Sequence, residues 1–169
     1  ALNEALQIAP THIKILYNLS EIYSTSNEAT AQAERKVCLQ KLVENAQGNL
    51  VPQLSLTEVN IKNQEADKAL ERMEIIAQQF PEFPKEARDY YNNTLDLLRK
   101  PDLEKALIQF TIFHNYMKVT SPYQAGIMDL KGPGGNLIGF PLIEYNKELI
   151  IQDVEQKSYL DVIVFSEVS

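Results

Sequence analysis

The sequence predicts a mainly α-helical protein made of antiparallel helical hairpins, with a small β-strand extension at its C-terminal end. Two observations predict the helical part: an apolar stripe with helical spacing that recurs along the chain, and short polar breaks between paired helical segments. A third observation, the change towards Gly, Pro and β-formers after Met117, predicts the extension.

The recurring apolar stripe is the strongest of these signals. From Ala66 to Phe80 the apolar side chains fall on one face of a helix, and the same offsets recur 37 residues later, from Leu103 to Met117. His114 is the polar exception in that second copy. The end of the stripe also matches the segment from Leu2 to Pro10, 71 residues upstream, and both copies close with a proline. Recurrence of this kind predicts a stack of similar helices.

A second helical segment precedes each stripe. Ile13 to Ser24 matches Pro84 to Leu98 at a separation of 71 residues, and a proline suits the first turn of a helix. Val51 to Ile61 is a shorter candidate in which helix and strand compete, because its apolar residues partly alternate. Glu28 to Ala46 is expected to be helical on propensity, with its buried face left open.

The composition changes after Met117. The residues Thr120-Ser121-Pro122 are expected to break the helix, Ala125 to Leu130 can form one turn, and Lys131 to Asn136 is expected to be irregular. Two segments beyond it, Leu137 to Tyr145 and Tyr159 to Phe165, are rich in β-formers and predict strands. The predicted organisation is therefore helical repeats over 1–117, a Pro/Gly-rich linker over 118–136, and a β-strand extension over 137–169 that could begin a further domain.

Composition and charge exclude several classes of partner. The 169 residues include 23 acidic and 16 basic side chains, a net charge of -7 that would repel nucleic acid. No run approaches the roughly 20 apolar residues of a membrane span. One cysteine and two histidines cannot supply a structural zinc site, so no metal is expected. The chain begins without Met in what reads as the second half of a helix, and it is expected to be a piece of a longer protein.

A family resemblance rests on small residues, closing prolines and one short motif. These are Ala5, Ala69 and Ala106, then Pro10 and Pro81, and the Leu-x-x-Leu-Ser-x-x-Tyr pattern from Leu16 to Tyr23. Together they resemble the tetratricopeptide repeat over roughly Ala1 to Met117, although units of 36 to 37 residues exceed the usual 34 and the middle unit departs from the pattern. The resemblance implies stacked hairpins with a concave groove. It also implies a scaffold that binds a protein or peptide partner, as a component of a larger complex.

The tail carries a second resemblance. Thr120 to Ile127, Lys131 to Gly135 and Phe165 to Ser169 look like the junction that joins such repeats to an FG-GAP (VCBS-like) β-propeller in bacterial proteins. This implies an alternative function, in which the chain is a structural spacer or assembly subunit that joins the repeats to a C-terminal β-propeller domain, and it favours an exported or periplasmic location in bacteria.

No residue set in the sequence indicates catalysis, and no cofactor is expected. His114 lies on an apolar stripe and is expected to pack at the end of the array under the tail. Cys38 lies mid-helix among apolar neighbours and is expected to be buried and inert. The glycines of Lys131 to Asn136 match neither a P-loop nor a dinucleotide-binding pattern. The sequence therefore predicts a protein that is not an enzyme.

The candidate partner-binding residues lie on the first helices of two hairpins. They are Lys14, Tyr17, Asn18 and Glu21 in one and Lys85, Arg88, Asp89 and Asn92 in the other. Lys14 and Asn18 could clamp a peptide carboxylate, but Asp89 at the matching position would repel one, so a solvated face is the competing interpretation. The two sets are expected to line one surface of mixed charge, suited to a polar, extended partner segment.

Overall fold

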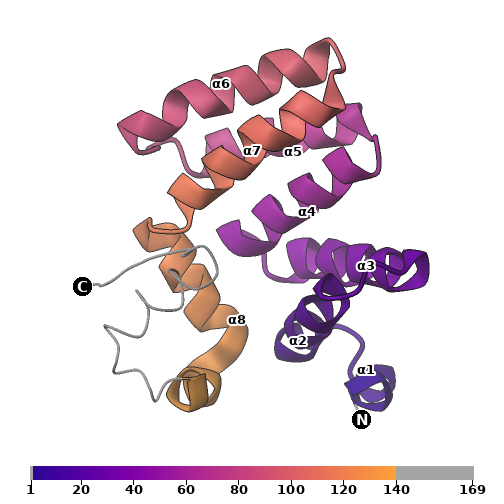
Figure 1. Ribbon diagram of the computed structural model, residues 1–169. Helices are drawn as coiled ribbons and strands as arrows, with labels where there is room; N and C mark the ends of the chain where they lie inside the picture. Colours follow the sequence, from indigo (N-terminus) through magenta and orange to yellow (C-terminus); the bar gives the residue numbers. More distant parts are fainter. Residues whose placement is uncertain (1, 140–169) are drawn as a thin grey trace. The chain divides into compact units, whose positions relative to one another are not determined.

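The computed structural model describes residues 2–139, and every element in that part of the chain is a helix (Figure 1). The helices are α1 (Leu2–Ile8), α2 (Ile13–Ser24), α3 (Ala29–Asn45), α4 (Leu50–Lys62), α5 (Ala66–Gln79), α6 (Lys85–Arg99), α7 (Leu103–Met117) and α8 (Ser121–Gly139). The predicted mainly α-helical class is confirmed. Residues 1–130 form one compact unit, which carries the surfaces described below.

The ambiguous segment Val51 to Ile61 is part of helix α4. Its apolar residues alternate in part because α4 is buried on nearly all sides, and a helix of that kind needs no single apolar stripe. The helix begins at a good cap, since the side-chain Oδ1 of Asn49 accepts a hydrogen bond of 3.0 Å from the Val51 backbone N–H.

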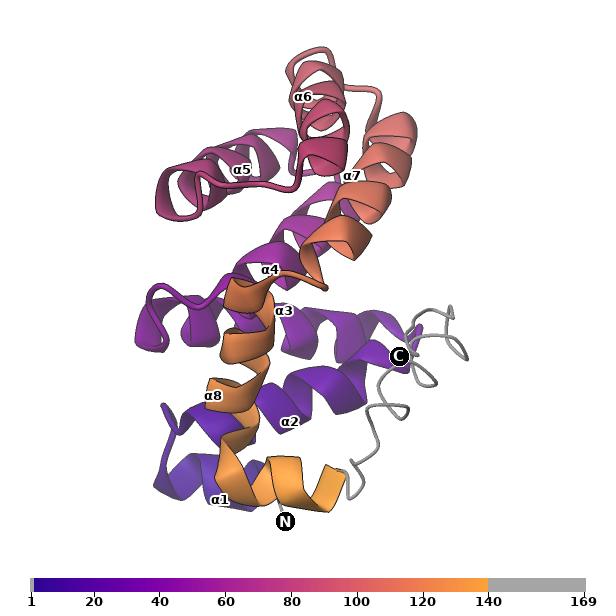
Figure 2. The ribbon, with the colours of Figure 1, turned by 90° about the vertical axis from the view of Figure 1, so that its left-hand side faces the viewer.

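Consecutive helices pack in pairs, α2 on α3, α4 on α5 and α6 on α7, and each pair packs on the next. Helix α4 also contacts α7, so it lies at the centre of the unit (Figures 1 and 2). It contributes to two apolar clusters: Leu50, Leu54 and Ile61 pack with α5, α6 and α7, whereas Val51, Leu56 and Val59 pack with α2 and α3.

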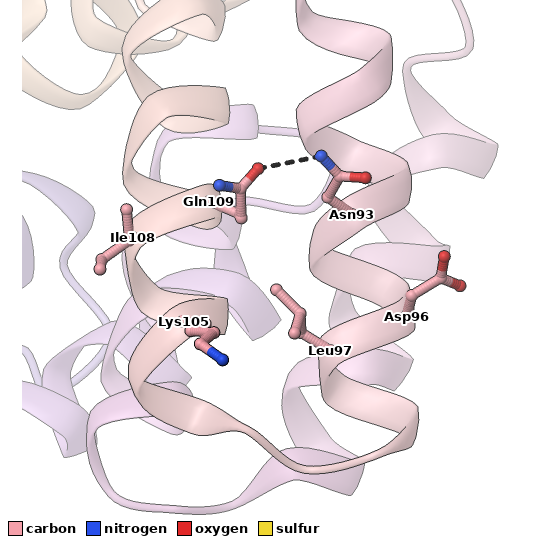
Figure 3. A pocket seen from close by; sticks show the side chains of 6 residues that line it. All are labelled: Asn93, Asp96, Leu97, Lys105, Ile108 and Gln109. Atoms are coloured by element: carbon pink, nitrogen blue, oxygen red, sulfur yellow. Dashed lines mark hydrogen bonds between the residues drawn. The ribbon is translucent and has the colours of Figure 1, made fainter.

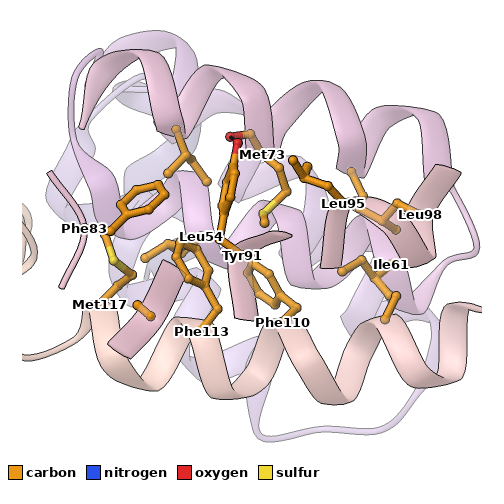
Figure 4. Packing of buried hydrophobic residues seen from close by; sticks show 14 of the residues in the cluster. Leu54, Ile61, Met73, Phe83, Tyr91, Leu95, Leu98, Phe110, Phe113 and Met117 are labelled. Carbon is orange, nitrogen blue, oxygen red and sulfur yellow. Dashed lines mark hydrogen bonds between the residues drawn. The ribbon is translucent and has the colours of Figure 1, made fainter. Parts of the chain in front are cut away.

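Aromatic rings fill the first of these clusters. Phe83 packs edge-on against Phe113 with ring centroids 5.2 Å apart, and it lies 4.9 Å from the ring of Tyr91 (Figure 4). The Tyr91 hydroxyl donates a hydrogen bond of 3.1 Å to the backbone carbonyl of Met73, so this buried polar group is satisfied.

Buried positions recur along the chain at a spacing of 37 residues. In the second helices of the pairs, Ala69, Met73 and Ile76 of α5 and Ala106, Phe110 and Phe113 of α7 are all fully buried. In the first helices α2, α4 and α6, the same spacing relates two sets of residues that are at least 93 % buried: Tyr17, Leu54 and Tyr91, and Ser20, Thr57 and Thr94. Between α2 and α6, buried residues match at a separation of 74 residues and also at the predicted 71, where Leu16 and Ser20 match Ala87 and Tyr91.

Helix α3 has a clear buried face, which the sequence left open. Its buried residues Arg35, Leu39 and Leu42 have the same spacing as Ala69, Met73 and Ile76, but they precede them by 34 residues. An arginine thus occupies the position that is alanine in α5 and α7. This is why the apolar stripe of α3 is hard to see in the sequence.

Helix α8 corrects the predicted linker. Ser121 begins the helix and Pro122 lies in its first turn, where proline is tolerated, so these residues start a helix after the break that follows Met117. The predicted single turn at Ala125 to Leu130 belongs to this longer helix, which continues to Gly139 with one non-helical residue, Gly132, at φ 76°. Leu137 to Gly139 are helical rather than extended, and the remaining predicted strand residues lie outside the described part of the chain.

Candidate interaction surfaces

Three of the four predicted residues on α2 face outward. Lys14 and Glu21 are exposed and Asn18 is half-buried. They follow one another at offsets of four and three residues, so they share one face of the helix.

Tyr17 was predicted to face outward with them, and that prediction is wrong. Its side chain is only 7 % exposed and packs in the cluster that contains Leu16 and Leu39. Leu16, Leu19 and Ser20 of the same helix are buried as well, so the buried face of α2 is wide enough to include Tyr17. Burial raises the pKa of the Tyr17 hydroxyl, and the nearby Glu21 carboxylate raises it further.

The four predicted residues on α6 are all exposed: Lys85, Arg88, Asp89 and Asn92. The guanidinium of Arg88 lies 5.1 Å from the centre of the Phe83 ring, a cation–π geometry that holds its side chain at the surface. Within the described residues, no hydrogen bond or ion pair joins this set to the set on α2.

Between these two sets lies the corresponding face of α4, and α8 covers part of it. The residues 37 positions after Lys14 and Glu21 are Val51 and Glu58, and Val51 packs beneath α8 at Gly126. Glu58 is 2.9 Å from the Lys62 ammonium. Burial by itself raises the pKa of the Glu58 carboxyl. The hydrogen bond and the charge of Lys62 are the main lowering effects, and the pKa lies below its ordinary value. Helix α8 therefore lies over Val51, on the helix that stands between α2 and α6 in the order of the pairs.

Helix α8 was not predicted in this place, because helix breakers and glycines in 118–136 suggested a linker. The sequence nevertheless contains one signal for it, since Tyr123, Gly126, Ile127 and Leu130 follow the spacing of one helix face.

His114 packs between α7 and α8, in agreement with its predicted place under the tail. Its ring lies 5.6 Å from that of Phe110 and 6.0 Å from that of Tyr123. Its Nε2 atom is buried and has no hydrogen-bond partner among the described residues, although the residue as a whole keeps some exposed surface. Burial lowers the pKa of His114 to about 3, with a further lowering by Lys118, so the ring is neutral near pH 7.

Cys38 is 3 % exposed, as predicted for a packed residue. Burial raises the pKa of its thiol, with a further contribution from Glu34, and a raised pKa lowers the fraction of reactive thiolate.

An open groove between α6 and α7 was not predicted from the sequence. It has a volume of about 390 Å³ and is lined by Asn93, Asp96, Leu97, Lys105, Ile108 and Gln109 (Figure 3). The Asn93 side-chain amide donates a 3.1 Å hydrogen bond to the side-chain Oε1 of Gln109. Ile108 is 56 % exposed and Leu97 is half-buried, so the groove presents apolar surface to solvent.

The described residues contain no group of three or more His, Cys, Asp or Glu side chains arranged to hold a metal ion. None of their helices has the length and apolar character that crossing a membrane requires.

Comparison with known proteins leaves the chain without a match: no family model, no curated protein and no solved structure is similar to it.

Proposed function

We propose that the chain is a protein-interaction scaffold of the tetratricopeptide-like class, in which stacked pairs of helices present polar side chains to a protein or peptide partner. The partner-binding residues in this proposal are Lys14, Asn18 and Glu21 on α2 and Lys85, Arg88, Asp89 and Asn92 on α6. Tyr17 is left out because it is buried.

One observation carries the repeat interpretation. Ser20, Thr57 and Thr94 are spaced by 37 residues, are at most 2 % exposed, and each donates its hydroxyl hydrogen bond to a carbonyl of its own helix. A small polar side chain bonded back to its helix lets a neighbouring helix approach closely. Three such residues at one spacing support three related helix pairs, which would stack as repeat proteins do.

Exposure and charge support a polar partner segment. The α2 set holds one cation, one amide and one carboxylate, and the α6 set holds two cations, one carboxylate and one amide. Charges at such a surface steer association and set specificity more than they add affinity. A partner segment with both signs of charge fits this arrangement.

The test is capture of a partner by the full chain, from an extract of the cells that encode it, with Lys14→Glu and Lys85→Glu combined. Because both lysines are exposed, we expect the melting temperature to change by no more than about 2 °C. Capture at low salt should fall by about fivefold or more, and its salt dependence should weaken.

A matched control reverses two other lysines, Lys41→Glu with Lys100→Glu, which changes the net charge equally. Capture that survives the first double reversal, or that falls equally in the control, would show that these faces of α2 and α6 do not bind the partner.

A further inference from the structure

The first ten residues of α8, 121–130, contact the rest of the unit through one stripe. Tyr123, Gly126, Ile127 and Leu130 stand at offsets of 0, 3, 4 and 7, the spacing with which an amphipathic helix fills a groove. Leu130 is fully buried and packs with side chains of α2, α3 and α4, and Ile127 packs on the same cluster.

Gly126 of α8 lies against Asn49 and Val51, at the N-terminal end of α4. A Cβ atom placed on it would stand 2.4 Å from Asn49 Oδ1 and 3.0 Å from Val51 Cγ2, so only glycine fits without a shift of its neighbours. The Asn49 side-chain amide donates a 3.1 Å hydrogen bond to the Gly126 carbonyl. Asn49 therefore caps α4 and holds α8 with the two ends of one amide group.

The first residue of the stripe is the aromatic Tyr123, which lies near two carboxylates. Tyr123 packs against both apolar clusters and against the ring of His114. Burial raises the pKa of its hydroxyl, and the carboxylates of Glu21 and Glu58 raise it further.

Residues 121–130 are also set apart from their neighbours in the chain. The turn that precedes them leaves Val119 71 % exposed, and Gly132, soon after them, has a positive φ of 76° that interrupts the helix. Residues 121–130 thus form a short helix with a break in the helical backbone at each end. Figure 2 shows it crossing in front of α2, α3 and α4.

We propose that the surface beneath residues 121–130 is a binding site for an amphipathic helix of a partner protein, which α8 occupies in the free chain. The partner helix carries the same chemistry: a tyrosine, a small residue three positions later, and aliphatic residues at positions four and seven. This inference rests on the proposed scaffold function and names a second kind of partner segment, since its contacts are apolar where the faces of α2 and α6 are charged. A tethered helix competes at high effective concentration, so a partner binds only when α8 is displaced.

The test uses the full 169-residue chain and a fluorescent peptide of residues 119–131 with the native sequence. Gly126→Val in the chain should expel α8, and hydrogen exchange of amides 121–130 should then accelerate. The variant should bind the peptide about tenfold tighter or more than the native chain does, because its groove is open. A peptide that itself carries Gly126→Val should not bind.

The matched control is Ala125→Val, which places the same residue on the exposed side of α8. Equal peptide binding by this control, or an open Gly126→Val chain that binds no peptide, would overturn the proposal. Unchanged protection of amides 121–130 in Gly126→Val would overturn it as well. If Gly126→Val fails to fold, as judged by circular dichroism, Leu130→Ala loosens α8 while leaving the groove intact, and the same outcomes apply.

Two further measurements separate this proposal from others. A dimer of the native chain that Gly126→Val abolishes would assign the groove to α8 of a second copy rather than to a partner protein. Lys14→Glu with Lys85→Glu should leave peptide binding unchanged, so a failure of the charged surface is distinguishable from a failure of this groove.

Discussion

Helices α4 and α6 occupy corresponding places in successive helix pairs, yet they have opposite surroundings. Ten of the 13 residues of α4 are buried, against five of the 15 residues of α6. The buried faces themselves correspond, since Leu50, Leu54, Thr57 and Ile61 match Ala87, Tyr91, Thr94 and Leu98 at the 37-residue spacing.

The difference comes from what packs on the other faces. Helix α4 contacts α3, α5 and α7, and α8 covers it at Val51, whereas α6 contacts only α5 and α7 among the larger helix contacts of the described chain. The comparison shows that the position of a helix within its pair determines which face is buried there. Later segments of the chain determine whether its other faces remain exposed to a partner.

The largest effect should come from the core of α4. Leu54 is fully buried, and Leu54→Ala should lower the free energy of unfolding by about 2–5 kcal/mol, because it leaves a cavity. Leu97→Ala on α6, where the side chain is only partly buried, should cost less than about 1.5 kcal/mol. Urea unfolding followed by circular dichroism measures both. Equal losses would contradict the contrast between the two helices.

Acid should loosen the packing of α7 against α8 at His114. Its folded-state pKa of about 3 lies below the ordinary value of 6.5, so the folded state disfavours the proton. The stabilisation by the neutral ring is complete above pH 6.5 and is lost as the pH falls from 6.5 towards 3. The loss should be up to about 1.4 kcal/mol per pH unit. Between pH 6.5 and 5, above the usual range of carboxylates, unfolding measurements should show this slope.

His114→Phe removes the titrating group and keeps a ring between Phe110 and Tyr123, so its stability should vary less with pH in that window. The exposed His12 provides the control, since His12→Gln should leave the slope as it is. A slope that persists in His114→Phe would assign it to other groups.

A smaller effect should follow Gly126→Ala on α8. Alanine favours a helix over glycine by about 1 kcal/mol, but here its Cβ would stand 2.4 Å from Asn49 Oδ1. We expect a net loss of about 1 kcal/mol, together with faster hydrogen exchange in residues 121–130. The control Ala125→Gly, on the exposed side of α8, measures the loss of stability that comes from helix propensity alone. A net gain of stability in Gly126→Ala would show that α8 lies less closely on α4.

The smallest expected effect tests whether Thr57 of α4 and Thr94 of α6 occupy equivalent positions. Thr57→Val and Thr94→Val each remove a hydroxyl that donates to a carbonyl of its own helix, at 2.8 Å and 2.7 Å. Because both sites are fully buried, each change should be below about 1 kcal/mol and the two should agree in sign. Thermal unfolding of the two single variants and the double variant is the measurement. Opposite signs would argue against equivalent positions.

Periodicity in the sequence was enough to place five helices, α1, α2, α5, α6 and α7. The spacing of apolar residues follows directly from the pitch of a helix, and it located α5, α6 and α7 within one or two residues. It also placed the buried alanines Ala69 and Ala106, and it identified Lys85, Arg88, Asp89 and Asn92 as outward-facing.

Register between distant helices was less certain from the sequence, because residues three or four positions apart share a helix face. Separations of 71 and of 74 residues each match two buried pairs of α2 and α6, so the spacing alone did not show that Tyr17 is buried. The sequence also left the choice between helix and strand open for α4, because a segment that is buried on most sides shows no single period of apolar residues.

The sequence by itself determined the mainly helical class, the positions of α1, α2, α5, α6 and α7, and the buried faces of α5 and α7, because these depend on the local spacing of apolar side chains. Only the tertiary structure decided that α8 lies across α4, that Asn49 and Gly126 meet, and that His114 is enclosed. Asn49 and Gly126 stand 77 residues apart in the chain. No local pattern encodes a contact of that range, since it depends on how all the intervening helices stack.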